Sequence, residues 1–305
     1  LGGSTIYQSS EFNKINNQYS SKWLENEISK LKNIKNLEIK TRTSVAAYHG
    51  YNFLLARENL TDHLPLNKKK DKIRQRLLKI RAKKVIAATG SIERPLIFNN
   101  NDRPGIILSS AIKKYSDYYG VVCGKENILF TNNDSAYETA ISLFNKGIKI
   151  NAIIDIREKV NSEITNHAEK IGIKIYNSYT IVDTSGYRRI KEVSIMKLSK
   201  DGQSVTGSKI KIKCNCLGIS GGWTPAVHLF TQSGGKLKFD NEDNVFIPSK
   251  YPSDQISIGS CNGEFDLNTI IKNFNQNIKN FLGIDKTSFE DLKINSTKEI
   301  LKRNI

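Results

Sequence analysis

Three short segments of this sequence are rich in small or polar residues and lie where a phosphate could bind. They are residues 88–90, 130–134 and 259–263, and each ends an apolar run typical of a buried strand. In open α/β sheets, ligands collect where such strands end, because the backbone amides and helix N-termini that follow attract phosphate. Small residues at the first and last segments allow the backbone to approach a pyrophosphate or a ribose closely. For either segment alone, a plain bend without a ligand is the simpler interpretation.

The middle segment has the position of a dinucleotide fingerprint but lacks the glycines of that motif. The side chains of Asn132, Asn133 and Asp134 would hinder close approach of a ligand, although Asp134 or Ser135 can cap the helix that follows. Asp155 lies near the end of the next predicted strand, where an acid would bind a ribose. We expect a degenerate, empty or altered nucleotide site here. We expect Asp155 to be a loop carboxylate rather than a ribose ligand.

The cysteines and histidines of the sequence form neither a metal-binding motif nor a catalytic motif. Cys214 and Cys216 face the same side of one predicted strand, but no second pair completes a metal site. We interpret both as core residues. The histidines have no carboxylate or nucleophile signature near them: His49, His63, His167 and His228. We therefore expect no catalytic residue and no metal ligand in this chain.

The rest of the sequence predicts the elements that must position these segments. Two antiparallel meanders are expected, at residues 37–58 with 73–82 and at residues 179–214, and each runs into an apolar strand that ends in glycine. A shift of about 132 residues places Gly90 on Gly222, so the order of elements repeats. Between these meanders lies a β-α-β-α-β run typical of a parallel sheet. Helices are predicted at residues 18–34, 136–144, 160–171 and 265–282, and further strands at residues 37–39, 85–90, 128–130, 150–154, 173–175, 216–222 and 255–259.

Length and composition narrow the class of protein. The chain has 305 residues, 38% of them hydrophobic and 25% charged, and contains no run of about 18 apolar residues. We expect a folded protein without a membrane span. Four cysteines without a C-x-x-C pair, and no secretory signal, predict a reducing, cytoplasmic compartment.

The strongly basic charge of +17 raises the question of nucleic acid as a partner. Lysine greatly outnumbers arginine, whereas phosphate and base recognition favours the planar fork of arginine. The densest basic run, residues 68–72, contains no aromatic residue and is typical of a solvated loop. We therefore expect no nucleic-acid partner.

Several stretches together resemble one protein family. They are A-T-G-S-I-E-R-P at residues 88–95, N-D-R-P-G at 101–105, T-N-N-D-S-A-Y at 131–137, S-G-G-W-T-P at 220–225 with His228, and Q-S-G-G at 232–235. This pattern resembles the alpha subunit of heterotetrameric sarcosine oxidase. The resemblance covers nearly all of residues 1–283.

The resemblance implies an α/β fold of the two-dinucleotide-binding-domain flavoprotein type, with three-layer β/β/α domains of the FAD/NAD(P)-binding class. It implies that this chain is a central fragment, which lacks a first β-α-β unit and a C-terminal aminomethyltransferase-like domain. The expected domains are residues 1–105 plus 245–283, an incomplete first dinucleotide-binding domain, and residues 106–244, a second and degenerate one. Residues 284–305 are expected to be a tail or a linker to the missing domain.

The resemblance also implies an activity, the oxidative demethylation of sarcosine to glycine. It implies NAD in this subunit, FAD and FMN in the assembled complex, and tetrahydrofolate bound through the missing domain. The implied partners are the flavin-carrying beta subunit, the smaller subunits and a small-molecule amine, and the fragment alone is expected to be inactive. The alternatives are a related amine or opine dehydrogenase subunit and a non-catalytic nucleotide-binding scaffold.

Carried over position by position, the resemblance implies binding residues rather than acid–base residues. They lie after the missing first unit, on the first meander and at two strand ends: Gly3, Ser4, Val45, Ala88, Thr89, Gly90, Ser260, Cys261, Asn262, Leu267 and Thr269.

Overall fold

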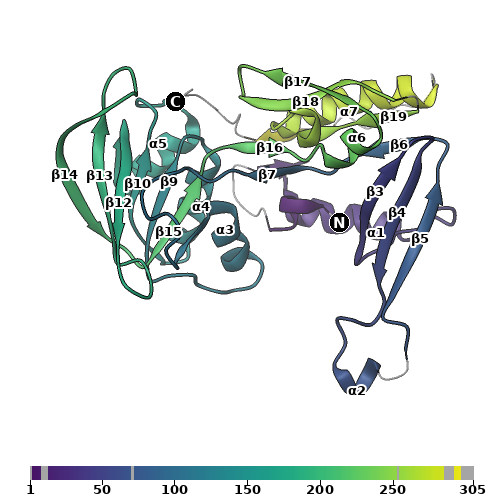
Figure 1. Ribbon diagram of the computed structural model, residues 1–305, viewed down its shortest axis with the longest axis horizontal. Coiled ribbons are helices and arrows are strands. Elements are labelled where there is room, and N and C mark those ends of the chain that lie inside the picture. The colour runs from purple at the N-terminus through teal and green to yellow at the C-terminus, as the bar shows by residue number, and fades with distance from the viewer. Residues whose placement is uncertain (1, 8–12, 70–71, 253, 285–291, 297–305) are drawn as a thin grey trace. The chain divides into compact units, whose positions relative to one another are not determined.

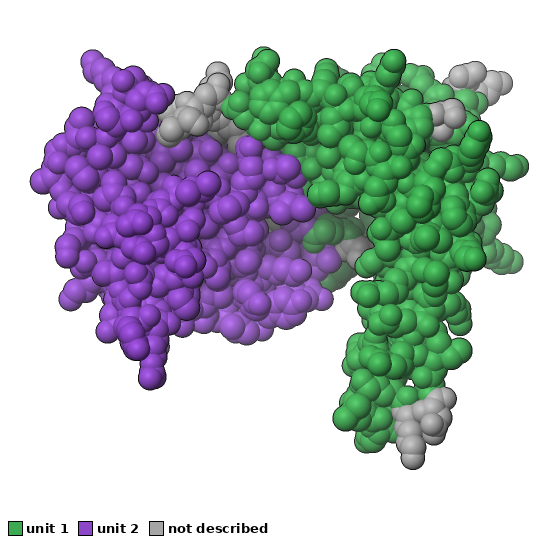
Figure 2. All heavy atoms as spheres, viewed as in Figure 1, with its two compact units in different colours: residues 1–3, 22–91, 225–294 green, residues 4–21, 92–224, 295–305 purple. Residues whose placement is uncertain are grey.

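The computed structural model describes residues 2–7, 13–69, 72–252, 254–284 and 292–296. The chain divides into two compact units (Figure 2). Unit 1 comprises residues 1–3, 22–91 and 225–294, and unit 2 comprises residues 4–21, 92–224 and 295–305. The functional domains expected from the sequence, with boundaries near residues 105 and 245, stay a prediction. Most of the expected tail, residues 284–305, lies outside the described residues.

Unit 2 is built around a parallel sheet of five strands. The strand order is β11-β10-β9-β15-β8, and every neighbouring pair is parallel. Both faces of such a sheet are buried, which explains why its strands have continuous apolar sequences. The strands are β8 (Ile106–Leu108), β9 (Glu126–Thr131), β10 (Lys149–Asp155), β11 (Ile175–Asn177) and β15 (Cys216–Ser220).

Helices cover one face of this sheet, and a three-stranded meander covers the other (Figure 1). Side chains alternate between the faces along a strand. Leu129 of β9 therefore packs against the helices, whereas Ile128 and Phe130 pack against the meander. Unit 2 thus has three layers. The helices are α3 (Ser109–Asp117), α4 (Ser135–Asn145) and α5 (Glu163–Lys170), and the meander consists of β12 (Tyr179–Ser185), β13 (Glu192–Leu198) and β14 (Val205–Lys213).

Unit 1 repeats the order of meander and parallel strand. The antiparallel meander β3-β4-β5 leads directly into β6, which pairs in parallel with β19. A hairpin, β17-β18, precedes β19, and a 3₁₀-helix, η2, follows it. The elements are β3 (Thr43–His49), β4 (Phe53–Asn59), α2 (Leu66–Lys69), β5 (Gln75–Arg81), β6 (Val85–Ala87), α6 (His228–Gln232), β17 (Lys236–Asp240), β18 (Val245–Lys250), β19 (Gln255–Ser257), η2 (Gly259–Asn262) and α7 (Leu267–Leu282).

Short elements complete the chain. They are η1 (Gly3–Tyr7), β1 (Asn13–Ile15), β2 (Gln18–Tyr19), α1 (Ser20–Leu31), β7 (Ser91–Glu93), β16 (Trp223–Pro225) and β20 (Ile294–Ser296).

The structure corrects three details of the expected elements. Residues 37–39 form no strand, and Leu37 is 42% exposed, so no burial favours an extended conformation there. The first helix ends at Leu31 rather than at Ile34, which is 46% exposed. Phe144 is 40% exposed and does not join the buried face of α4. In each case the sequence pattern predicted that an apolar residue is buried, whereas the fold leaves it at least 40% exposed.

Candidate functional site

The two predicted turns of unit 1 lie side by side at one edge of the β6-β19 sheet. Ala87 is paired with Ser257, and the Ile258 N–H donates to the Ala87 carbonyl at 3.0 Å. A Cβ placed on Gly90 would lie 4.0 Å from Ser260 Oγ, so the two turns lie close to each other. We call residues 88–90 and 259–263 the glycine turns.

Backbone conformation explains why glycine stands at these turns. Gly90 has φ of +77° and Gly259 has φ of +74°. Both values lie in the left-handed region, which costs residues with a Cβ roughly 1 kcal/mol or more. The N–H groups of Gly259 and Ser260 open η2 and form no hydrogen bond with the described residues. The glycine turns therefore present unpaired backbone donors that suit an anion such as a pyrophosphate.

Side chains of the glycine turns themselves bond to neighbouring parts of unit 1. Cys261 is 2% exposed, and its Sγ lies 3.3 Å from the Ala87 carbonyl and 3.2 Å from that of Ile258. Its thiol thus points into the core, and only its backbone faces the turn. Thr89 Oγ1 donates to the Ala226 carbonyl at 2.7 Å, and Asn262 Oδ1 accepts from the Tyr251 hydroxyl at 2.8 Å. These contacts fix the turns before any ligand binds.

Two predicted residues lie at the start of α7. Leu267 is its first residue and is half-buried. The N–H and the hydroxyl of Thr269 both donate to Asp266 Oδ2 at 2.9 Å, so Asp266 caps this helix. The carboxylate already supplies the negative charge that a helix N-terminus attracts. The backbone N–H of Thr269 is therefore already paired within the chain.

The remaining predicted residues are not joined to the glycine turns. Val45 lies on β3, is 39% exposed and is paired with Ala56. No described interaction links it to either turn. Gly3 and Ser4 belong to η1, and the division between the units falls between them. The structure thus brings together Ala88, Thr89, Gly90, Ser260, Cys261 and Asn262, and the role of all these residues in binding a cofactor stays a prediction.

Unit 2 has a different arrangement at the matching strand ends. Its turn, residues 131–135, contains the fully buried side chain of Asn133. The Asn133 amide donates to the Ser220 carbonyl at 3.1 Å and to the Ser220 hydroxyl at 3.0 Å. Its Oδ1 accepts from the N–H of Ser135 at 3.1 Å and from the Ser135 hydroxyl at 2.6 Å. We call residues 131–135 the asparagine turn, and its own amide oxygen takes the first donor of α4.

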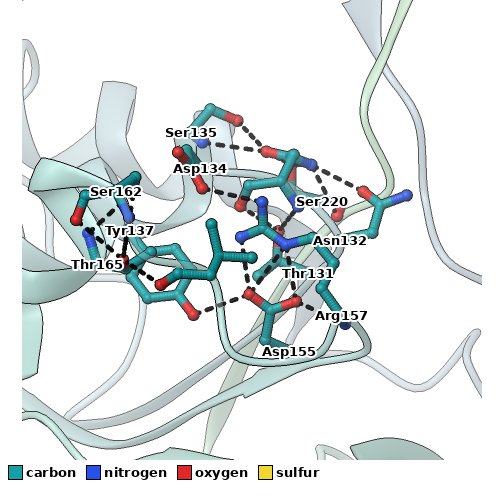
Figure 3. Close-up of polar contacts among 12 residues, drawn as sticks. Thr131, Asn132, Asp134, Ser135, Tyr137, Asp155, Arg157, Ser162, Thr165 and Ser220 are labelled. Carbon is teal, nitrogen blue, oxygen red and sulfur yellow. Dashed lines mark hydrogen bonds and ion pairs between the residues drawn. The ribbon is translucent and has the colours of Figure 1, made fainter. Parts of the chain in front are cut away.

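A buried ion-pair network lies next to the asparagine turn (Figure 3). The Arg157 guanidinium donates to Asp155 at 2.7 Å and to Asp134 at 2.9 Å, and all three residues are at most 3% exposed. The Tyr137 hydroxyl donates to Asp155 at 2.8 Å. Burial lowers the pKa of Arg157, but the hydrogen bond and charge of Asp155 and the charge of Asp134 outweigh it and raise that pKa. Burial first, and then Asp155, raise the pKa of Tyr137.

This network corrects the expectation for Asp155. It is not a loop carboxylate but the last residue of β10, with 0% exposure. Its partner Arg157 follows only two residues later, and this pair was missed because a sequence does not show which side chains turn inward. The carboxylate that would bind a ribose is here held by an arginine of the same chain.

Glu93 is a second side chain that the sequence analysis missed. Its Oε2 accepts from the Ser110 N–H at 2.8 Å and from the Ser110 hydroxyl at 2.6 Å, at the start of α3. The side chain is 5% exposed, and this burial raises its pKa, although the hydrogen bonds from Ser110 and Ser220 oppose the shift. The only sequence signal was its place in the A-T-G-S-I-E-R-P stretch. At both α3 and α4, an oxygen of this chain thus stands where a bound anion would accept hydrogen bonds.

The cysteines behave as the sequence predicts. Cys214 and Cys216 are 2% and 0% exposed, and burial raises the pKa of each thiol to about 12. Both are core residues, as expected, and neither forms a thiolate near neutral pH. Within the described residues, no cluster of metal-ligating side chains is found. None of the helices in that part of the chain is long and apolar enough to cross a membrane.

No family model matches the chain. Three similar curated proteins all have the same name. The chain is 32% identical over 255 residues to the sarcosine oxidase subunit alpha of Corynebacterium sp. (strain P-1), a match that covers 83% of this chain and 26% of that protein. The same subunit of Corynebacterium sp. (strain U-96) is 31% identical over 74% of this chain and 23% of that protein. That of Rhizobium meliloti (strain 1021) is 29% identical over 71% of this chain. The chain spans about a quarter of the length of these relatives.

Solved structures with a similar fold are flavoprotein oxidoreductases. L-proline dehydrogenase from P. horikoshii matches 98% of this chain and 53% of that chain with a TM-score of 0.62 at 18% identity. T. acidophilum thioredoxin reductase matches 93% of this chain and 86% of that chain with a TM-score of 0.63 at 16% identity. These matches confirm the expected α/β fold of the FAD/NAD(P)-binding type.

Proposed function

Because this chain belongs to the family of the sarcosine oxidase alpha subunits and has the fold of flavoprotein oxidoreductases, we propose that it is the dinucleotide-binding part of an amine-oxidising subunit. The observation that carries this proposal is the pair of glycine turns at the ends of β6 and β19. Their unpaired Gly259 and Ser260 N–H groups suit a pyrophosphate, and Gly90 leaves space beside them.

The ligand proposed for this site is NAD. The unpaired N–H groups would hold its phosphates, and the absence of a side chain at Gly90 and Gly259 would admit them. A bound NAD is able to accept a hydride, whereas FAD and FMN of the assembled complex would carry the amine oxidation. The residues of the glycine turns orient the ligand and move no proton, in keeping with a role in binding.

The overall reaction proposed is that of sarcosine oxidase. Sarcosine, oxygen and water would give glycine, formaldehyde and hydrogen peroxide, or the one-carbon unit would pass to tetrahydrofolate bound by another domain. If the flavins of the complex oxidise the amine and reduce the oxygen, this reaction requires no catalytic side chain from the described residues. The flavin-carrying beta subunit and the smaller subunits of the complex are therefore proposed as partners.

The thiols of this chain favour amine oxidation over disulfide reduction, the activity suggested by the name of the thioredoxin reductase with a similar fold. A disulfide reductase needs an accessible thiolate. Cys214, Cys216 and Cys261 are at most 2% exposed, and Cys214 and Cys216 have a pKa of about 12. Cys123 is half-buried, and burial raises the pKa of its thiol as well. The related alternative is a dehydrogenase of proline or of opines, which the fold match to an L-proline dehydrogenase favours.

The experiment that tests the proposed function is an assay of the natural full-length protein, expressed together with its beta subunit. Peroxide released on addition of sarcosine, and not of proline or an opine, is the expected result. Reduction of a dye with proline or an opine, without peroxide, would instead establish the dehydrogenase. No turnover of any amine, with nucleotide still bound, would support the alternative of a non-catalytic scaffold.

A further inference from the structure

An apolar surface begins in the last turn of α3 in unit 2 and continues over the residues that follow this helix. Five large side chains within eight consecutive residues are 48–57% exposed: Tyr115, Tyr118, Tyr119, Val121 and Val122. We call them the tyrosine patch. Single exposed apolar residues are ordinary, but a contiguous group marks an interaction site. Tyrosine in particular is enriched at the centres of protein interfaces.

The tyrosine patch is already ordered in the isolated chain. The rings of Tyr118 and Tyr119 pack edge to face with centroids 4.9 Å apart, and Tyr115 lies 6.0 Å from Tyr119. The Val121 N–H donates to the Tyr115 carbonyl at 2.8 Å, which folds the following residues back onto the helix. On its other side α3 is anchored by Ile112, which is 1% exposed. Such preorganisation reduces the entropy lost when a partner binds.

The charges beside this patch are positive. Lys114 and Lys125 are exposed on either side of it in the sequence. Asp117, the one acid among residues 115–122, has a side chain only 6% exposed and is paired with Lys146 at 2.5 Å. The neighbouring Lys113 is buried and paired with Glu138 at 2.8 Å. The exposed, unpaired charges next to the patch in the sequence are therefore lysines, because Asp117 is paired with Lys146 and Glu126 is paired with Lys149 at 2.8 Å.

We propose that the tyrosine patch is the surface on which the beta subunit of the oxidase docks, through a face that is aliphatic at its centre and acidic at its rim. A second copy of this chain fits poorly, because two identical patches would place Lys114 and Lys125 against lysines of the same kind. An acidic partner has the complementary charge. This inference rests on the proposed function, which makes the chain one subunit of an assembly.

The test is a binding measurement between the natural full-length protein and the purified beta subunit, at low and high salt. The double variant Tyr118→Ser/Tyr119→Ser is expected to weaken binding by about 10- to 100-fold, since buried interface tyrosines typically contribute this much. Lys114→Glu is expected to weaken binding mainly at low salt. Tyr51→Ser and Tyr187→Ser are the matched controls, because these residues are 93% and 88% exposed and lie outside the patch.

Each outcome decides a different point. The proposal is supported if the wild-type protein and the control variants bind the beta subunit and the double variant does not. Equal binding by the wild type and the double variant overturns the docking surface and leaves the proposed function intact. A homodimer that the double variant abolishes assigns the patch to a second copy and overturns the proposal. Wild-type protein that does not bind the beta subunit contradicts the proposed function itself. Unchanged unfolding of the double variant shows that it folds.

Discussion

The glycine turns of unit 1 and the asparagine turn of unit 2 stand at matching places, where parallel strands end. In unit 1, the Gly259 and Ser260 N–H groups face no acceptor among the described residues. In unit 2, Asn133 Oδ1 already accepts from the first N–H of α4, and Glu93 accepts from the start of α3. The same strand-end position thus carries unpaired donors in unit 1 and paired donors in unit 2, and the side chains of the turn decide which.

The comparison extends to the acid at the end of a strand. Asp155 of unit 2 has the position of a ribose-binding carboxylate, yet Arg157 and Tyr137 occupy its oxygens. The N–H groups of Ser110 and Ser135 and the carboxylate of Asp155 are thus already paired within the chain. We expect, therefore, that unit 1 takes a dinucleotide and that unit 2 takes none.

The largest effect is expected from breaking the ion-pair network of unit 2. Arg157→Ala leaves Asp155 and Asp134 buried without their arginine, which typically costs 3–5 kcal/mol. Equilibrium urea unfolding measures the loss, and Trp223 reports on unit 2 when Trp23 of unit 1 is replaced by phenylalanine. The exposed Arg188→Ala is the control and is expected to change stability by less than about 0.5 kcal/mol. A loss below about 1 kcal/mol for Arg157→Ala would contradict the account of unit 2.

The next effect concerns ligand binding by unit 1. Gly259→Val places a branched side chain next to the unpaired N–H groups and is expected to reduce NAD affinity at least about tenfold, or roughly 1.4 kcal/mol. Gly207→Val is the matched control, because Gly207 has φ of +77°, close to the +74° of Gly259, but lies on β14 of unit 2. Calorimetric titration distinguishes the two. Equal affinities of both variants would show that the glycine turns do not hold the ligand.

A smaller effect is expected when the tyrosine of the network is changed. Tyr137→Phe removes the hydroxyl that donates to Asp155 at 2.8 Å but leaves Arg157 in place. The loss of this buried, charge-assisted hydrogen bond is expected to cost about 1–2 kcal/mol, again measured by urea unfolding. Tyr187→Phe, at an 88% exposed position, serves as the control. NAD affinity is expected to stay unchanged in both, and a decrease for Tyr137→Phe would mean that unit 2 contributes to the site.

The smallest effect is a pH dependence that Glu93 contributes to stability. Burial raises the pKa of Glu93, so the folded protein holds this proton more tightly than the unfolded chain does. The free energy of unfolding should therefore fall as pH rises from the ordinary carboxyl pKa of about 4.3 through the raised folded value. In Glu93→Gln, which keeps an acceptor for Ser110, this component of the fall should be missing. Urea unfolding between pH 4 and 8 measures it, with the exposed Glu163→Gln as control, and identical pH profiles of Glu93→Gln and the wild type would refute it.

Much of the fold follows from local sequence patterns. The repeated order of meander, apolar strand and glycine correctly predicted β3-β4-β5 before β6 and β12-β13-β14 before β15. Gly90 and Gly222 indeed both have positive φ, +77° and +94°. The false strand at residues 37–39 shows the limit of this approach, because apolar residues predict burial only when a neighbouring element exists to cover them.

The site was less predictable than the fold. The side-by-side placement of residues 88–90 and 259–263 could be inferred because parallel strands end at one edge. The inward thiol of Cys261 and the roles of Glu93 and Arg157 could not, since they depend on partners up to 174 residues away. Asn133 was expected to hinder a ligand, but its bonds to Ser220 exist only once β15 lies beside β9.

The most direct test of the difference between the units is hydrogen–deuterium exchange of the natural full-length protein with and without saturating NAD. The account predicts slower exchange in peptides that contain residues 88–90 and 259–263, and no change in those that contain residues 131–135 and 155–157. Slower exchange in the asparagine turn, or none in the glycine turns, would contradict it.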